Sequence, residues 1–193
     1  MKKRRIIVGL SGASGMPIAQ ELLRQLHQQE DIEVHLVYSR GAEMTIQQEL
    51  SCGISELEAL ADCVHNNSNI GASIASGSFH TDGMVVVPCS MKTLAGIVSG
   101  YSDNLLLRAA DVVLKERRKL VLVTRECPLS TIHLRNLYEA SQVGAVILPP
   151  VLSYYNHPQT VQDCTNHIVG KIMDQFGLEF QQFHRWSGMH ETV

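Results

Sequence analysis

The chain has 193 residues, of which 45% are hydrophobic and 18% charged, and its net charge is −3. The length suits one domain over residues 1–193, and the composition excludes a disordered or collagen-like chain. The charge balance argues against a nucleic-acid or membrane-surface partner, which would need a basic surplus. No apolar run reaches the ~18–20 residues of a membrane span. The run at residues 6–10 is too short for a signal-peptide core, so a cytoplasmic protein is expected.

Apolar, β-branched runs alternate with helical patterns along the chain. A strand is predicted at residues 5–10, with a helix at about 17–28, and further strands are predicted at 32–38, 84–87, 120–124 and 145–148. Short, nearly continuous apolar strands separated by helices are typical of a parallel sheet that is buried on both faces. We therefore expect an α/β fold, a doubly wound parallel sheet in a three-layer α/β/α sandwich. Residues 51–81 have poor periodicity and should form short helices and loops.

A second apolar pattern predicts a largely buried helix at residues 104–118. Arg108 lies in its apolar middle, where an unpaired cation is costly, so either a bound anion or a structural carboxylate is expected beside it. Lys115 lies two turns later on the same face, and an Asp111–Lys115 ion pair is the simplest interpretation there. The basic residues that follow are expected to form a solvated turn.

Ligands of a doubly wound sheet bind outside the carboxyl ends of the strands, and the first predicted strand is followed there by a Gly/Ser turn at residues 11–15. Its glycines permit a tight turn and close backbone approach, and the amides of the following helix favour an anion. The glycine spacing does not fit G-x-G-x-x-G, and Ser39 and Arg40 replace the acid that would hold an NAD ribose. A turn that binds nothing is the simpler alternative.

The next loops also carry polar residues. Ser90 can cap the helix after the third predicted strand, and with Thr93 and the free helix-start amides it can also hold a phosphate. Arg125 and Glu126 follow the fourth strand, where they could pair with neighbours or could bind a phosphate and move a proton. The fifth strand leads into a proline-stiffened loop with aromatic hydroxyls at residues 154–155.

Metal and disulfide chemistry have little support in the sequence. The five cysteines form no CxxC pair and fit neither a disulfide framework nor a zinc module, so most should be small core residues in a reducing compartment. The nine histidines form no HxH or HExxH pattern, so no metal site is expected. Trp186, the only tryptophan, is by itself more typical of a packing residue than of a lid.

Taken together, the loops resemble the UbiX/Pad family of flavin prenyltransferases, which are flavodoxin-like or Rossmann-like flavoproteins. Each motif alone is weak, but the ordered set is specific and spans nearly the whole chain. The motifs are SGASG at 11–15, Ser78-Phe79, the segment 84–94, the helix segment 108–116, Arg125-Glu126 with Pro128-Leu129-Ser130, Pro149-Pro150, Tyr155 with His157-Pro158-Gln159, and the segment 174–177.

The resemblance implies a metal-independent transferase. Such enzymes join the dimethylallyl group of dimethylallyl monophosphate to N5 and C6 of reduced FMN, and the prenylated FMN serves a UbiD-type decarboxylase that acts on aromatic or unsaturated acids. Members of the family are large homo-oligomers, commonly dodecamers, and the same is expected here.

The resemblance also implies roles for individual residues. Ser14, Glu49 and Glu126 match the positions that handle protons. Tyr155 and Lys171, helped by Arg108 and Lys115, would meet the prenyl phosphate, and Trp186 would lie near the prenyl group. Many relatives have Arg at the position of Lys171. Lysine keeps the positive charge there but lacks the bidentate fork of arginine. FMN would contact Gly12, Ala13, Ser14, Ser39, Ser90, Met91, Lys92, Thr93 and Arg125.

Two alternative functions remain open at this stage. An FMN-dependent decarboxylase of the cysteine-decarboxylase type shares the fold, but it leaves the cations Arg108, Lys115, Arg125 and Lys171 unexplained. A non-catalytic FMN-binding subunit of a decarboxylase complex is the second alternative.

Overall fold

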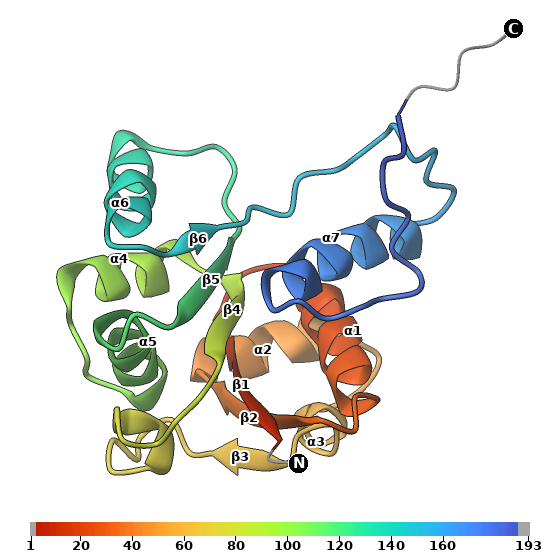
Figure 1. The fold of residues 1–193 in the computed structure, drawn as a ribbon. Coiled ribbons are helices and arrows are strands. Elements are labelled where there is room, and N and C mark those ends of the chain that lie inside the picture. Colours follow the sequence, from red (N-terminus) through yellow and green to blue (C-terminus); the bar gives the residue numbers. More distant parts are fainter. Residues whose placement is uncertain (1–2, 189–193) are drawn as a thin grey trace, which may run out of the picture.

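The computed structural model describes residues 3–188, and in them six parallel strands form one sheet with the order β3-β2-β1-β4-β5-β6 (Figure 1). The strands are β1 (Arg4–Leu10), β2 (Ile32–Tyr38), β3 (Cys63–His65), β4 (Gly83–Cys89), β5 (Lys119–Thr124) and β6 (Val146–Ile147). The helices are α1 (Met16–His27), α2 (Arg40–Glu49), α3 (Ile54–Glu58), the short 3₁₀ helix η1 (Ser73–Ala75), α4 (Met91–Ser99), α5 (Leu105–Lys115), α6 (Thr131–Gln142) and α7 (Val161–Gln175). The predicted doubly wound α/β fold is confirmed.

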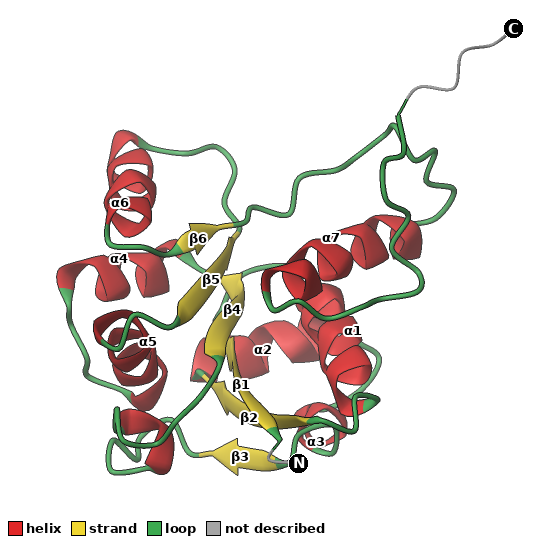
Figure 2. Ribbon diagram, in the orientation of Figure 1, coloured by secondary structure: helices red, strands yellow, loops and turns green. Residues whose placement is uncertain are grey.

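Helices cover both faces of the sheet (Figure 2). Successive strand residues point to opposite faces, so Ile6 and Val8 enter one core, with α1, α2, α3 and α7. Ile7 enters the other core, with α4, α5, α6 and η1. All seven residues of β4 are buried. Burial on both faces is why the strands are nearly continuous apolar runs in the sequence.

Two elements differ from the sequence prediction. Strand β3 lies inside the segment that we expected to hold only short helices and loops. A strand of three residues is too short to produce a visible alternation of apolar and polar residues. Helix α5 ends at Lys115, before the predicted end at about residue 118, and Arg117 beyond it has φ 56. This left-handed conformation does not continue a helix.

The turn after α5 is solvated at Arg117 and Lys119, as expected, but Arg118 is partly buried. The Arg118 guanidinium donates to the carbonyl oxygens of Gly77 at 2.7 Å and Phe79 at 3.0 Å. These carbonyls belong to the loop before β4, and a planar guanidinium can donate to two acceptors at once. Lys115 pairs with Glu116, and the predicted Asp111–Lys115 pair does not form.

The strand order reverses between β1 and β4, and the loops that leave these two strands open a crevice at the carboxyl edge of the sheet. Ser11, buried directly after β1, joins the two loops. Its Oγ donates to the Pro88 carbonyl at 2.9 Å and accepts from the Ser90 amide at 2.8 Å. Within residues 3–188, no helix has both the length and the apolar character that crossing a membrane requires.

Candidate active site

A cleft of about 810 Å³ lies at this switch point. Its walls are the turn after β1, the first residues of α2 and α4, the segment between α4 and α5, and one side of α6. The volume falls in the range of ~300–1,000 Å³ that is usual for small-ligand pockets. Five of the residues predicted to bind the cofactor line the cleft: Gly12, Ser39, Ser90, Lys92 and Thr93.

Two helices begin at the cleft, each with a serine cap. Ser39 Oγ accepts from the Ala42 amide at 3.2 Å at the start of α2. At the start of α4, Ser90 Oγ accepts from the Thr93 amide at 3.3 Å and donates to Thr93 Oγ1 at 3.1 Å. The first-turn amides that these caps leave over have no partner within their own helix and carry partial positive charge, so they favour an anion. This part of the cleft can hold one phosphate group.

The turn after β1 touches the start of α2 backbone to backbone. A Cβ atom built on Gly12 would lie 3.0 Å from both Cα and the carbonyl carbon of Gly41. This separation is shorter than ordinary van der Waals contact between carbon atoms, about 3.5–4.0 Å. Glycine at position 12 therefore lets the turn after β1 and the start of α2 approach each other.

Gly12→Ala should lower the melting temperature by roughly 2–12 °C. Overpacking costs about 1–3 kcal/mol, and ~1 kcal/mol corresponds to about 2–4 °C for a chain of this size. Thermal unfolding measures the effect. Gly53→Ala is the matched control, because the nearest atom to its Cβ would be Ser55 Oγ at 3.8 Å and its φ of −89 suits any residue. Equal melting temperatures for the two variants would contradict the prediction.

Ser14, Glu49 and Arg125, three of the predicted residues, come together at the start of α1. Glu49 Oε2 accepts from the Gly15 and Met16 amides, both at 2.8 Å. Burial by itself raises the pKa of Glu49, but the Ser14 hydroxyl, the two amides and the charge of Arg125 lower it overall. The carboxylate is thus ionised at neutral pH, so it can accept a proton, and the Ser14 hydroxyl lies beside it.

Glu126 lies directly after Arg125 in the loop that follows β5, and both side chains are exposed. The Arg125 amide donates to the Cys89 carbonyl at 3.1 Å, which fixes this loop beside the end of β4. Glu126 Oε1 accepts from the Cys127 amide at 3.0 Å. In the part of the chain that the structure describes, no ion pair joins Arg125 and Glu126. The carboxylate therefore keeps one oxygen available to a ligand.

The loop after β6 and the C-terminal segment bring together a second set of predicted residues. The Tyr155 ring packs edge-on against Trp186, with centroids 5.3 Å apart, and against His167 at 5.8 Å. Hollows of about 490 and 590 Å³ open beside this loop. Lys171 is exposed on α7, one turn after His167. Burial and the charge of Lys171 lower the pKa of His167.

Within a single chain, Arg108 and Lys115 do not line the cleft. The Arg108 guanidinium donates to Asp111 Oδ2 at 2.6 Å and to the Ala75 carbonyl at 3.3 Å. The sequence left open a bound anion or a structural carboxylate as the partner of Arg108, and the structure contains the carboxylate. Lys115 ends α5 next to the loop that leads into β4, at the amino edge of the sheet. Helix α5 runs antiparallel to the strands, which places its end far from the carboxyl edge.

Several residues of the cleft were not predicted from the sequence. Asn67 accepts from the Leu105 amide at its backbone carbonyl (2.8 Å) and from the Leu106 amide at Oδ1 (2.9 Å), which fixes the start of α5 at the wall of the cleft. Helix α6 contains no recognisable binding or catalytic motif, so its sequence did not indicate that its side chains would line the cleft. The unpredicted residues include Asn67, Tyr101, Ile132, Arg135, Asn136 and Glu139.

Comparisons with known proteins agree with this geometry. A model of the Flavoprotein family matches residues 1–173. The chain is 54% identical to a probable UbiX-like flavin prenyltransferase of Sedimentibacter hydroxybenzoicus, covering 95% of this chain and 97% of that protein. It is 51% identical to the flavin prenyltransferase UbiX of Escherichia coli K12, covering 96% and 99%.

Solved structures give the same result. AnUbiX in complex with FMN and dimethylallyl pyrophosphate superimposes with a TM-score of 0.95 at 49% identity, covering 98% of this chain and all of that chain. A dodecameric FMN-dependent UbiX-like decarboxylase from Escherichia coli O157:H7 gives 0.94 at 53%, covering 95% and 100%. The cysteine decarboxylase SpaF gives 0.62 at 16% identity, covering 76% and 83%, which shows a shared fold alone.

Proposed function

Because this chain belongs to the Flavoprotein family and is 51–54% identical to UbiX-type flavin prenyltransferases along nearly its whole length, we propose that it joins the dimethylallyl group of dimethylallyl monophosphate to reduced FMN. The observation that carries the proposal is the cleft at the β1/β4 switch point, where two serine-capped helices begin, with the ionised Glu49 beside it.

The residues of the cleft fit FMN, whose reduced ring supplies the acceptor atoms N5 and C6. The hydroxyls of Ser39, Ser90 and Thr93 and the amides that begin α2 and α4 would hold its single phosphate. The close approach of Gly12 to Gly41 keeps this end of the cleft free of side-chain bulk. Ala13, Ser14, Met91, Lys92 and Arg125 complete the proposed binding set.

The prenyl donor would be held by the second set of residues. Tyr155 and Lys171 would neutralise charge on the departing phosphate, in the place that a metal ion takes in other enzymes. The Trp186 ring would stabilise the allylic cation through a cation–π interaction worth about 2 kcal/mol when water is excluded. Glu126, and Glu49 through Ser14, would accept and return protons at the carbons that react.

The proposed enzyme is a homo-oligomer, in which a neighbouring copy supplies Arg108 and Lys115 to the prenyl phosphate. Exposed apolar side chains support such an assembly. Tyr154 is 73% exposed, Tyr138 65% and Trp186 56% in the single chain. Aromatic residues are enriched in subunit interfaces, and assembly would bury these side chains.

Sedimentation should therefore show an assembly larger than a dimer, with dodecamer as the expected size. Tyr154→Glu, which places a charge in the expected contact, should shift the protein toward smaller species and reduce turnover together. Tyr101→Glu is no suitable control because Tyr101 lines the cleft, so Gln28→Glu, which adds the same charge at an exposed polar position, serves instead. A wild-type monomer with full activity would refute the proposed assembly.

The proposed function is tested by the mass of the flavin product. Purified protein with reduced FMN and dimethylallyl monophosphate should yield FMN enlarged by one C₅ unit, and dimethylallyl pyrophosphate in a parallel reaction tests the choice of donor. Loss of carbon dioxide from a cysteine-ended peptide would favour the cysteine-decarboxylase alternative. FMN binding with neither reaction would favour a non-catalytic subunit.

Lys171→Ala should raise the KM for the prenyl donor by about 10-fold or more and change kcat less. A hydrogen bond to a charged group contributes about 1.5–3 kcal/mol. Lys171 would contact the prenyl donor in the ground state and in the transition state alike, so its loss affects KM more than kcat. Steady-state kinetics at saturating FMN measure the two constants, and Lys171→Arg should restore binding because the charge returns. An unchanged KM would exclude Lys171 from the donor site.

The product, prenylated FMN, would then pass to a UbiD-type decarboxylase. This partner and a cytoplasmic location stay predictions from the family resemblance, as does the assignment of residues 1–193 to one domain. Activation of a UbiD-type apo-decarboxylase in vitro by prenylated FMN that copurifies with this protein would support the predicted partner.

A further inference from the structure

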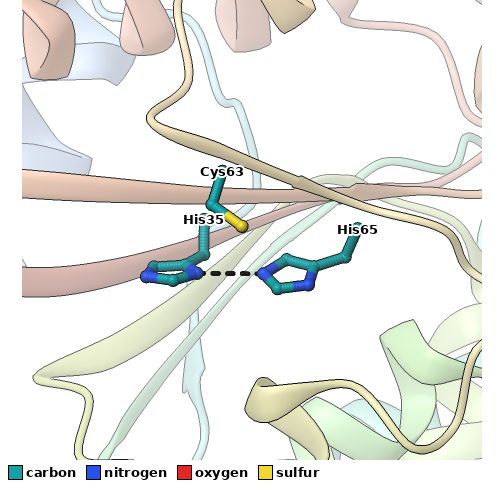
Figure 3. Close-up of side chains that lie close together, drawn as sticks. All are labelled: His35, Cys63 and His65. Carbon is teal, nitrogen blue, oxygen red and sulfur yellow. Dashed lines mark hydrogen bonds between the residues drawn. The ribbon is translucent and has the colours of Figure 1, made fainter.

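His35 and His65, both buried, and the half-buried Cys63 form a cluster on one face of the sheet (Figure 3). His35 lies on β2, and Cys63 and His65 lie on the edge strand β3. The strands run parallel, with His35 opposite Cys63 in the register. Residues two apart on a strand share a face, so both side chains of β3 point to the side that His35 occupies. The proposed transferase mechanism uses none of these three residues.

The donor atoms of the cluster converge. His35 Nδ1 lies 2.9 Å from His65 Nε2, and the nearest ligand atoms of all three residues lie within 4.8 Å of one another. Figure 3 shows the Cys63 sulfur directed toward the two rings beside this contact. Zinc is held at about 2.0–2.1 Å by imidazole nitrogen and about 2.3 Å by sulfur, so tetrahedral ligand nitrogens lie about 3.3 Å apart. The two nitrogens would separate by only about 0.4 Å to admit the ion.

Glu33 supplies an independent indication of a ligand. The other ring nitrogen of His35, Nε2, lies 2.9 Å from Glu33 Oε1. A carboxylate only accepts, so Nε2 carries the proton and the lone pair of a neutral His35 lies on Nδ1, directed into the cluster. A histidine that ligates a metal characteristically donates its second N–H to such a carboxylate. Arg5 Nε in turn donates to Glu33 Oε2 at 3.1 Å, which fixes the orientation of the carboxylate.

We propose that His35, Cys63 and His65 bind one zinc ion, with water as the fourth ligand. Two imidazoles and one sulfur suit zinc, whereas carboxylate-poor sites of this kind do not suit calcium or magnesium. Binding converts the Cys63 thiol to a thiolate and releases one proton to solvent. The ion links the three-residue edge strand β3 to β2. It thereby also fixes the segment that continues from β3 to Asn67 at the cleft wall.

Sequence spacing did not reveal this site because His35 and His65 are 30 residues apart and only the pairing of β2 with β3 brings them together. Cys63 and His65 alone form a C-x-H pair, which is not a zinc motif. None of the three ligands lines the cleft, so zinc binding can be measured apart from the proposed transferase activity.

The test uses the full-length protein, stripped with a chelator and titrated with zinc chloride in a calorimeter. One zinc per chain is expected, and the zinc-edge X-ray absorption spectrum should show one sulfur among nitrogen and oxygen neighbours. Cys63→Ser should weaken binding by at least ~10–100-fold, the loss that removal of even an outer-shell partner causes. The matched control Cys52→Ser, at another half-buried cysteine, should bind zinc as the wild type does.

Zinc should also raise the melting temperature of the wild type and of Cys52→Ser, but not that of Cys63→Ser. Equally tight binding by Cys63→Ser, or the absence of stoichiometric binding by the wild type, would overturn the proposal and leave the cluster as a histidine pair. Should Cys63→Ser fail to fold, the wild-type absorption spectrum decides: a zinc shell without sulfur overturns the proposed site. FMN binding by each variant, measured in parallel, reports its fold.

Discussion

Glu126→Gln should leave FMN binding close to that of the wild type and slow turnover by ~100-fold or more. The substitution keeps the shape of the side chain and removes only its titratable group. Glu126 Oε1 accepts from the Cys127 amide, and a glutamine oxygen can accept the same hydrogen bond, so the loop after β5 should keep its conformation. Binding titrations with FMN and single-turnover rates with the prenyl donor measure the two quantities separately.

The competing explanation is that Glu126 only orients Arg125 for the FMN phosphate. In that case Glu126→Gln would lose FMN affinity and spare the chemical step once the flavin is saturating. The described residues contain no Arg125–Glu126 ion pair, which favours proton transfer. Arg125→Lys is the matched variant, because it keeps the charge and changes the donor geometry. Arg125→Lys should lower FMN affinity with a much smaller effect on the single-turnover rate. If Glu126→Gln instead weakened FMN binding and Arg125→Lys instead slowed the chemical step, the roles assigned to Glu126 and Arg125 would be exchanged.

The sequence predicted the central sheet and the loops at its carboxyl edge because burial on both faces leaves a strong local pattern. Strand β3 left none, since a three-residue edge strand with an exposed Val64 has neither length nor alternation. The zinc cluster was hidden for a related reason: its ligands come from two strands, and their register is a property of the sheet. Local sequence carries information on turns and caps, as at Ser90, but not on which distant residues meet.

The same limit applies to the candidate site. The helix-capping serines and the glycine turn were recognisable because their chemistry depends on neighbours within three residues. Arg108 was left with two possible partners, since the sequence could not decide between a carboxylate one turn away and an anion from outside the chain. The structure places Asp111 beside it. The cleft wall from α6, including Arg135 and Glu139, depends on how that helix packs, which no local motif encodes.

Glu49→Gln should also reduce turnover strongly, by ~100-fold, while its effect on stability should be small and dependent on pH. Glutamine can still accept hydrogen bonds from the Gly15 and Met16 amides, so the fold should persist. What disappears is a negative charge at the N-terminus of α1, a loss of about 0.3–1 kcal/mol at neutral pH. Turnover under saturating substrates and chemical denaturation between acid and neutral pH measure the two effects.

The direction of the pH effect follows from the pKa of Glu49, which is lowered in the folded chain from its ordinary value of 4.5. The folded state therefore favours the ionised form, and the stability this provides is present above the unfolded pKa and is lost as the pH falls through the folded one. The difference in unfolding free energy between wild type and Glu49→Gln should thus be present at neutral pH and vanish in acid. A difference that grows in acid would contradict the ionised state.

Ser14→Ala separates a proton path from simple charge stabilisation. The Ser14 hydroxyl lies near the Glu49 carboxylate and helps to lower its pKa, so a proton taken up through Ser14 would require both groups. Each single variant should then lose a similar factor in single-turnover rate, and the double variant should lose little more, because residues that act as one unit are strongly non-additive. If the two losses multiply instead, Glu49 acts on the reaction independently of Ser14, through its charge alone.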